Sequence, residues 1–186
     1  MSNGRSHALE MEKTRHNNVM RAKPDLRVVF DWMLTRSGSV NPAVIRLQTM
    51  AQELNWPADA YERQKLLVRF LLDVLRQSET KFDELARPCV FAERFVNDEA
   101  DREEMQHHAG KYWDLLRSNN QISDFSTIEL LVARIAICLL NRSSDDPNED
   151  LDWIFELLDM VDREINSEFY ELAGNVFESK YAKLLQ

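Results

Sequence analysis

The last 44 residues of the chain, 143–186, carry its charge imbalance along an apolar helical pattern. They hold 12 Asp and Glu residues against 3 Lys and Arg residues, and their net charge of −9 equals that of the whole chain of 186 residues. An apolar series runs through them at steps of three or four residues, with one step of seven: Leu151, Ile154, Leu158, Val161, Ile165, Leu172 and Val176. Such spacing is typical of one helix face. The sequence therefore predicts a long acidic C-terminal helix, from about Asn148 towards Leu185, that packs by its apolar face and turns carboxylates outward.

A scarcity of turn-forming residues favours helices in the rest of the chain. With only 4 Gly and 5 Pro, the chain has few positions for the tight turns of a sandwich, a barrel or a doubly wound sheet. Its length and its hydrophobic content of 44% suit one domain with one core. We expect an all-α fold, a single-domain antiparallel helical bundle of about seven helices over residues 24–186. Residues 1–23 have a net charge of +3, and we expect them to form a flexible or partly helical basic N-terminal arm.

Proline residues and an apolar run mark the expected helices. Pro24 and the Asn41–Pro42 pair begin the first two, and Pro57 begins the third. Pro88 interrupts the next apolar segment and should kink or split its helix. The run 130–140 is apolar at almost every position, which predicts a helix buried on most sides.

The cysteine content and the hydropathy of the chain indicate the cellular compartment that we expect for it. Cys89 and Cys138 are too few for a disulfide framework and lie in apolar surroundings, as expected in a reducing environment. The longest apolar run, Leu130–Leu140, contains Arg134 and falls well short of the roughly 20 residues that span a bilayer. We expect a cytoplasmic protein that has no membrane segment.

Arg102 and His107 form an Arg-x4-His pair, with His108 at the next position. The pair resembles the catalytic motif of HEPN ribonucleases, which are helical dimers. The resemblance implies an endoribonuclease in which Arg102 stabilises phosphate charge and His107 moves a proton. Glu103 departs from the motif, because the family usually has a polar Asn, His, Asp or Lys after the Arg.

Glu104 and His107 also form half of the Glu-x-x-His metal-ligand pattern of ferritin-like di-iron proteins. The second half is missing, because neither His7 nor His16 has a Glu three residues before it. Neither cysteine has a zinc-ligand neighbour, and no glycine-rich phosphate loop occurs. The sequence therefore predicts neither a metal nor a cofactor.

Residues 41–78 have the outline of a helix-turn-helix. In that interpretation the helix from Pro57 would present side chains to DNA: Tyr61, Arg63, Gln64 and Lys65. The near-neutral charge and apolar density of the segment favour an ordinary packed hairpin instead. Nucleic-acid binding remains an alternative only through the basic residues 1–23.

The acidic C-terminal segment gives the leading hypothesis. Its expected partner-binding residues combine carboxylates with two aromatic side chains: Asp152, Trp153, Phe155, Glu156, Asp159 and Asp162. We expect a non-enzymatic protein-protein interaction or regulatory module, of the immunity, antitoxin, chaperone or assembly-subunit type, that binds a basic partner through this acidic helix face. The apolar face either packs within the molecule or closes a homodimer, and the sequence leaves both open.

Overall fold

The computed structural model describes residues 54–118, 121–140 and 146–185. All of them belong to one compact unit of the chain. In these ranges the chain forms helices and connecting loops and no β-strand, so the predicted all-α class is confirmed for the described residues. The basic arm at 1–23 and the helices expected from Pro24 and Asn41–Pro42 lie outside them.

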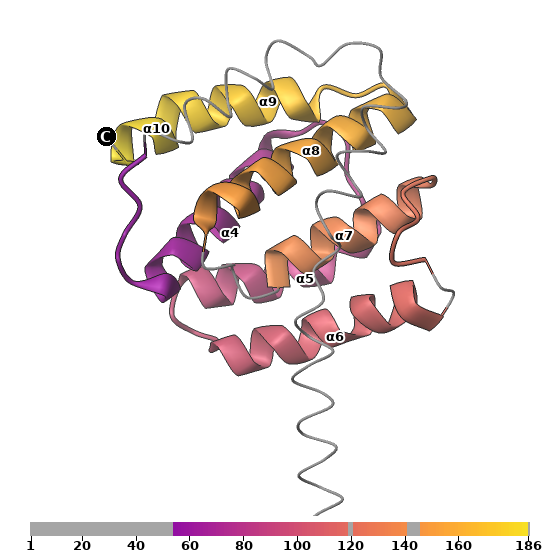
Figure 1. Ribbon diagram of the computed structural model, residues 1–186, viewed down its shortest axis with the longest axis horizontal. Coiled ribbons are helices and arrows are strands. Elements are labelled where there is room, and N and C mark those ends of the chain that lie inside the picture. The colour runs from indigo at the N-terminus through magenta and orange to yellow at the C-terminus, as the bar shows by residue number, and fades with distance from the viewer. Residues whose placement is uncertain (1–53, 119–120, 141–145, 186) are drawn as a thin grey trace, which may run out of the picture. The chain divides into compact units, whose positions relative to one another are not determined.

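The helices follow one another through short connections (Figure 1). In chain order they are α4 (Ala60–Gln77), α5 (Asp83–Val96), α6 (Arg102–Ser118), α7 (Ile128–Leu140), α8 (Pro147–Ile165), α9 (Phe169–Val176), a π-helical turn η1 (Phe177–Tyr181) and α10 (Ala182–Leu185). None of these helices is both long and apolar enough to cross a membrane.

The apolar helix α7 lies at the centre of this arrangement. It contacts α4, α5, α6 and α8, and its side chains are buried from Leu130 to Ile137 and again at Leu139 and Leu140. Figure 1 shows α6 along one edge of the molecule, with α8 and α9 on the opposite side of α7. The prediction that this helix is buried on most sides is therefore confirmed.

Local capping explains where α4 and α5 differ from expectation. The Asp59 carboxylate accepts hydrogen bonds from the backbone N–H groups of Tyr61 and Glu62 at 2.7 and 3.0 Å, so α4 begins at Ala60 rather than Pro57. Pro88 does not split α5, which is one helix. A proline there removes one backbone hydrogen bond early in the helix, and its side chain is buried.

The single long C-terminal helix predicted from the sequence is wrong. Helix α8 ends at Ile165, and Asn166 has φ 53°, a left-handed conformation that Asn tolerates better than most residues. The break falls between Ile165 and Leu172, although Phe169 continues the apolar spacing across it. Gly174 lies inside α9.

An aromatic cluster joins α4, α8 and the C-terminal helices. The Phe70 ring of α4 lies 5.6 Å from Phe155 of α8, 5.7 Å from Phe177 and 5.5 Å from Tyr181, measured between ring centroids. The Tyr181 hydroxyl donates a hydrogen bond of 2.5 Å to the carboxylate of Asp73 in α4. These contacts hold the end of the chain against α4 and fix one side of α8.

Candidate functional site

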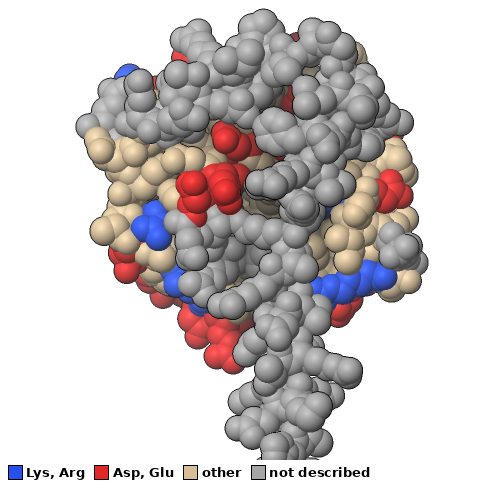
Figure 2. Space-filling view, viewed as in Figure 1, with Lys and Arg blue, Asp and Glu red and all other residues tan. Residues whose placement is uncertain are grey.

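Three carboxylates of α8 lie on one face of the helix. Asp152, Glu156 and Asp159 follow at spacings of four and three residues, which places them within an arc of about 60° at 3.6 residues per turn. We call these three residues the carboxylate row. Figure 2 shows acidic side chains gathered on the face of the molecule over which α8 runs.

The carboxylate row is much less exposed than the sequence predicted. Glu156 is only 5% exposed and Asp159 8%, while Asp152 is half-buried. Helix α8 packs against α4, α7 and α9 and buries side chains around most of its circumference, including two residues of the row. The expected outward-facing acidic surface is therefore corrected at Glu156 and Asp159.

One cation lies in line with the row. Arg163, one turn after Asp159 on the same face, forms an ion pair with the Asp159 carboxylate. Among the described residues Glu156 has no such partner, and its Oε2 atom is buried without a hydrogen bond. An uncompensated buried carboxylate is costly, so such a group either keeps a proton or receives a cation.

The pKa values of the three acids in the row are raised, as expected for buried carboxylates that lack a compensating charge. Burial, with smaller contributions from Asp152 and Asp159, raises the pKa of Glu156 to about 7. Burial, followed by Asp146 and Glu149, raises the pKa of Asp152 to about 6. The pKa of Asp159 is also raised by burial, although Arg163 opposes the shift. Near neutral pH the row therefore holds fewer than three negative charges.

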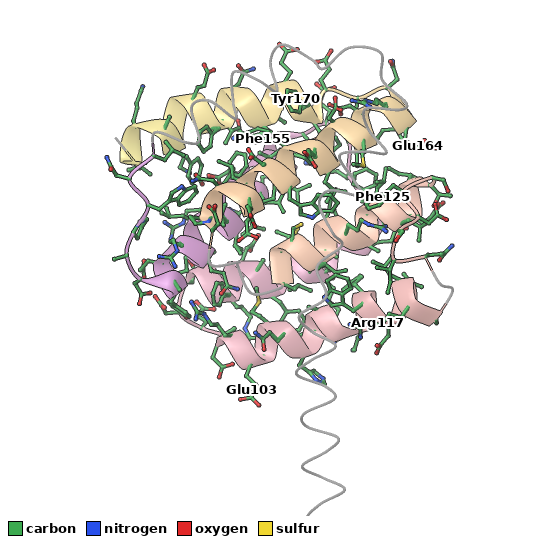
Figure 3. The ribbon with its side chains drawn as sticks, in the orientation of Figure 1. Glu103, Arg117, Phe125, Phe155, Glu164 and Tyr170 are labelled. Carbon is green, nitrogen blue, oxygen red and sulfur yellow. The ribbon has the colours of Figure 1, made fainter. Side chains whose placement is uncertain are left out.

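Tyr170 adds an unpaired hydroxyl beside the row. This α9 residue is 6% exposed and its hydroxyl has no hydrogen-bond partner. Its ring packs on the Phe155 ring of α8 with a centroid distance of 5.7 Å, and Figure 3 labels both side chains. Burial raises the pKa of Tyr170, and the next largest contributions come from Asp159 and Asp152. The phenol thus lies within electrostatic reach of the row.

Two of the residues predicted to bind a partner are engaged within the molecule. Phe155 is 4% exposed and belongs to the aromatic cluster. The Asp162 carboxylate accepts hydrogen bonds from the backbone N–H groups of Phe169 and Tyr170, both 2.7 Å, and from the Ser167 hydroxyl at 2.6 Å. Asp162 therefore caps the N-terminus of α9.

Trp153 lies between core and surface. It is half-buried, and its ring meets the Phe125 ring edge-on at a centroid distance of 5.9 Å. Arg134 lies over the other ring of this pair, with its guanidinium carbon 4.0 Å from the Phe125 centroid. Trp153 is consequently held in position by Phe125, with part of its side chain accessible.

The Arg102 and His107 pair does not converge in the described structure. Both lie on α6, where a separation of five residues turns the side chains about 140° apart around the helix axis. The Arg102 guanidinium lies over the Tyr61 ring, 5.0 Å from its centroid. His107 is exposed, and His108 stacks on Phe91 at 3.6 Å. No described contact favours a ribonuclease site here.

Glu104 is also engaged elsewhere. Its carboxylate pairs with Arg94 at 2.7 Å. Within the part of the chain that the structure describes, no group of three or more His, Cys, Asp or Glu side chains is arranged to hold a metal ion.

The four side chains considered for DNA contact are bonded, packed or buried within the protein. Lys65 pairs with Asp98, and Arg63 donates to the carbonyl oxygens of Pro57 and Ala58. Tyr61 packs edge-on against Phe95 at 5.1 Å. Gln64 is buried. These contacts support the packed arrangement that the charge of the segment favoured.

Comparison of the chain with family models, curated proteins and solved structures gives no match. The chemistry of the described residues is therefore the basis for assigning a function.

The sequence identified the acids of α8 but missed Tyr170. A tyrosine four residues beyond an Asn is not a recognisable signal by itself. Its importance follows from the break at Asn166, which turns α9 back along α8 and brings the phenol near the row.

Proposed function

We propose that the protein is a non-enzymatic helical-bundle interaction module whose carboxylate row receives a Lys or Arg side chain from a basic partner protein. The observation that carries the proposal is the charge of the row. Among the described residues, Asp152, Glu156 and Asp159 face a single cation, Arg163. A cationic side chain from a partner would supply the missing compensation.

The gradient of exposure along the row suits a long, flexible cation. Asp152 is half-buried at one end, whereas Glu156 is almost completely buried one turn later. A Lys or Arg side chain has an apolar stem that can pass Asp152 and carry its charge inward. Trp153, half-buried on the next position of α8, would offer part of an aromatic surface to the partner at the edge of the row. Tryptophan is enriched among the residues that dominate binding at protein interfaces.

The function that these features support is capture of a basic protein. The four types of module named above, the immunity, antitoxin, chaperone and assembly-subunit types, all fit a compact helical protein with an anionic binding row. Electrostatic attraction would chiefly accelerate association and make it sensitive to salt.

An oligolysine peptide tests the proposal. Fluorescence anisotropy of a labelled peptide of 12 lysines should show saturable binding at low salt that weakens as salt is raised, and an oligoglutamate peptide should not bind. The variant D152N/E156Q/D159N should lose at least about tenfold in affinity, equivalent to about 1.4 kcal/mol.

The matched control removes the same charge elsewhere. The variant E164Q/E168Q/E171Q neutralises three exposed acids of the same segment and should change affinity by less than about twofold, because exposed charges interact weakly. Equal losses in the two variants would show that oligolysine responds to net charge alone, and the carboxylate row would no longer be the binding site.

A further inference from the structure

The carboxylate row and Tyr170 form a cluster in which two buried polar groups have no partner. The Glu156 Oε2 atom and the Tyr170 hydroxyl both lack a hydrogen bond, and both residues are more than nine-tenths buried. Glu156 lies one helical turn from Asp152 and one from Asp159, so Cβ atoms of like-charged residues are about 6 Å apart. Three full negative charges cannot be held cheaply in this arrangement.

Several charged groups of the helices packed against α8 have contacts away from the row. From α7, Arg134 donates to the carbonyl oxygens of Leu130, Gln121 and Ile122. From α4, Asp73 accepts from Tyr181 and pairs with Lys180, while Lys65 pairs with Asp98. From α9, the group that reaches the row is the neutral phenol of Tyr170. In the described structure, Arg163 is thus the cation that faces the row, and it pairs with Asp159.

We propose that binding of a cationic side chain at the carboxylate row is coupled to release of a proton from Glu156, so that partner capture strengthens as the pH rises through neutrality. The coupling rests on the proposed function and specifies how that function is regulated. Below neutral pH, Glu156 in the free protein keeps its proton. When an ammonium or guanidinium group arrives, the O–H bond of the Glu156 carboxyl breaks, the proton passes to solvent, and the carboxylate pairs with the cation.

Tyr170 is a positioning residue in this exchange. Its hydroxyl has no hydrogen-bond partner among the described residues, and the carboxylates whose charge acts on it are those of Asp159 and Asp152, so a row that gains negative charge favours a hydrogen bond from this phenol. A hydrogen bond to the charged form of an acid favours that form. Tyr170→Phe should therefore shift the pH dependence of capture to higher pH, a readout that a purely structural role would leave unchanged.

Thermodynamic linkage fixes the expected size of the effect. If one proton leaves for each cation bound, the association constant rises by up to about tenfold per pH unit below the titration of the row and becomes constant above it. The lysines of the peptide remain charged over this range, because their usual pKa is about 10.4. The pH dependence of binding then reports the titration of groups in the protein and not in the peptide.

Isothermal titration calorimetry with the 12-residue oligolysine measures the coupling directly. The heat of binding at pH 6, 7 and 8 is compared in PIPES and in imidazole, which both buffer near neutral pH and differ in ionisation enthalpy, and the difference gives the number of protons released. The wild-type protein should release a substantial fraction of a proton at pH 6 and almost none at pH 8, with tighter binding at pH 8. Glu156→Gln should release fewer protons than wild type at pH 6 and pH 7, and its affinity should change less between pH 6 and pH 8, because only Asp152 and Asp159 remain to titrate.

Two further variants keep the result unambiguous. Glu164→Gln alters an exposed acid near the end of α8 and should behave as wild type. It also controls for histidines, which titrate in the same pH range and are unchanged in this variant. Asp152→Asn keeps Glu156 and should still release a proton, so a folding defect in the Glu156→Gln variant would not remove the evidence. Circular dichroism checks the helical content of each variant.

The outcomes separate the coupling from the function on which it rests. Wild-type binding of equal strength at pH 6 and pH 8 without proton release would overturn the coupling and leave the interaction module standing. Release of equal numbers of protons by wild type and Glu156→Gln would overturn the assignment to Glu156. Absence of oligolysine binding at every pH would overturn the proposed function and the coupling together.

Discussion

At the scale of the residue, Glu156 is the position where burial and neighbouring charge act in the same direction. Burial disfavours its carboxylate, and Asp152 and Asp159 add repulsion from the adjacent turns. A glutamic acid with a pKa of about 7 changes its charge in the physiological range, which an ordinary carboxyl group does not. The sequence showed the spacing of these acids but not their burial, because burial depends on the helices that cover α8.

The stability of the protein should record this titration. Because the pKa of Glu156 is about 7 in the folded protein and 4.5 as its ordinary value, the folded state binds more protons between those limits. The contribution of Glu156 to the free energy of unfolding is therefore fully present below pH 4.5. It is lost as the pH rises towards 7, and the loss is roughly 3 kcal/mol at most. Urea unfolding at pH 5 and pH 8 should show a smaller decline for Glu156→Gln than for wild type. The same decline in both proteins would contradict the prediction, and Glu164→Gln serves as the control.

At the scale of the element, the separation of α8 from α9 depends on Asp162 and Asn166. Asn166 takes the left-handed backbone conformation that ends α8, and the Asp162 side chain reaches past it to cap α9. Periodicity alone could not find this break, because the apolar series continues on both sides of it. Phe169 lies four residues after Ile165 and three before Leu172, so no apolar position is missing at the break.

Removal of the cap should destabilise α9 first. Asp162→Ala leaves the N–H groups of Phe169 and Tyr170 without their acceptor, which should cost about 1–2 kcal/mol of unfolding free energy. Hydrogen exchange should accelerate at these amides more than in α7. Glu164→Ala removes an exposed acid two residues away and should have little effect. Unchanged protection at Phe169 and Tyr170 in Asp162→Ala would show that the cap is dispensable.

At the scale of the whole molecule, contacts between distant segments decide which surfaces remain available. Tyr181 is 2% exposed and bonds to Asp73, 108 residues earlier. This contact holds the C-terminal helices against α4, next to the aromatic cluster that includes Phe155. Phe155, which the sequence predicted to bind a partner, is thereby placed in the core.

The same long-range contact predicts a difference between two neighbouring substitutions. Tyr181→Phe removes a buried hydrogen bond to a carboxylate and should lower the free energy of unfolding by about 1.5–3 kcal/mol. Lys180→Ala removes an ion pair whose lysine is about half exposed and should cost less than about 1 kcal/mol. Chemical denaturation of the two variants provides the measurement. A larger loss for Lys180→Ala would reverse the assigned roles.

The sequence by itself determined the helical class of the described residues, the burial of α7 and the acidic character of α8. These properties follow from composition and from the order of residues along one helix. Tertiary structure alone decided that Glu156 and Asp159 are buried, that Asp162 caps α9 and that Tyr170 lies beside the row. The physical reason is that periodicity identifies the faces of a helix, whereas the exposure, charge state and partners of each face depend on which other helices pack against it.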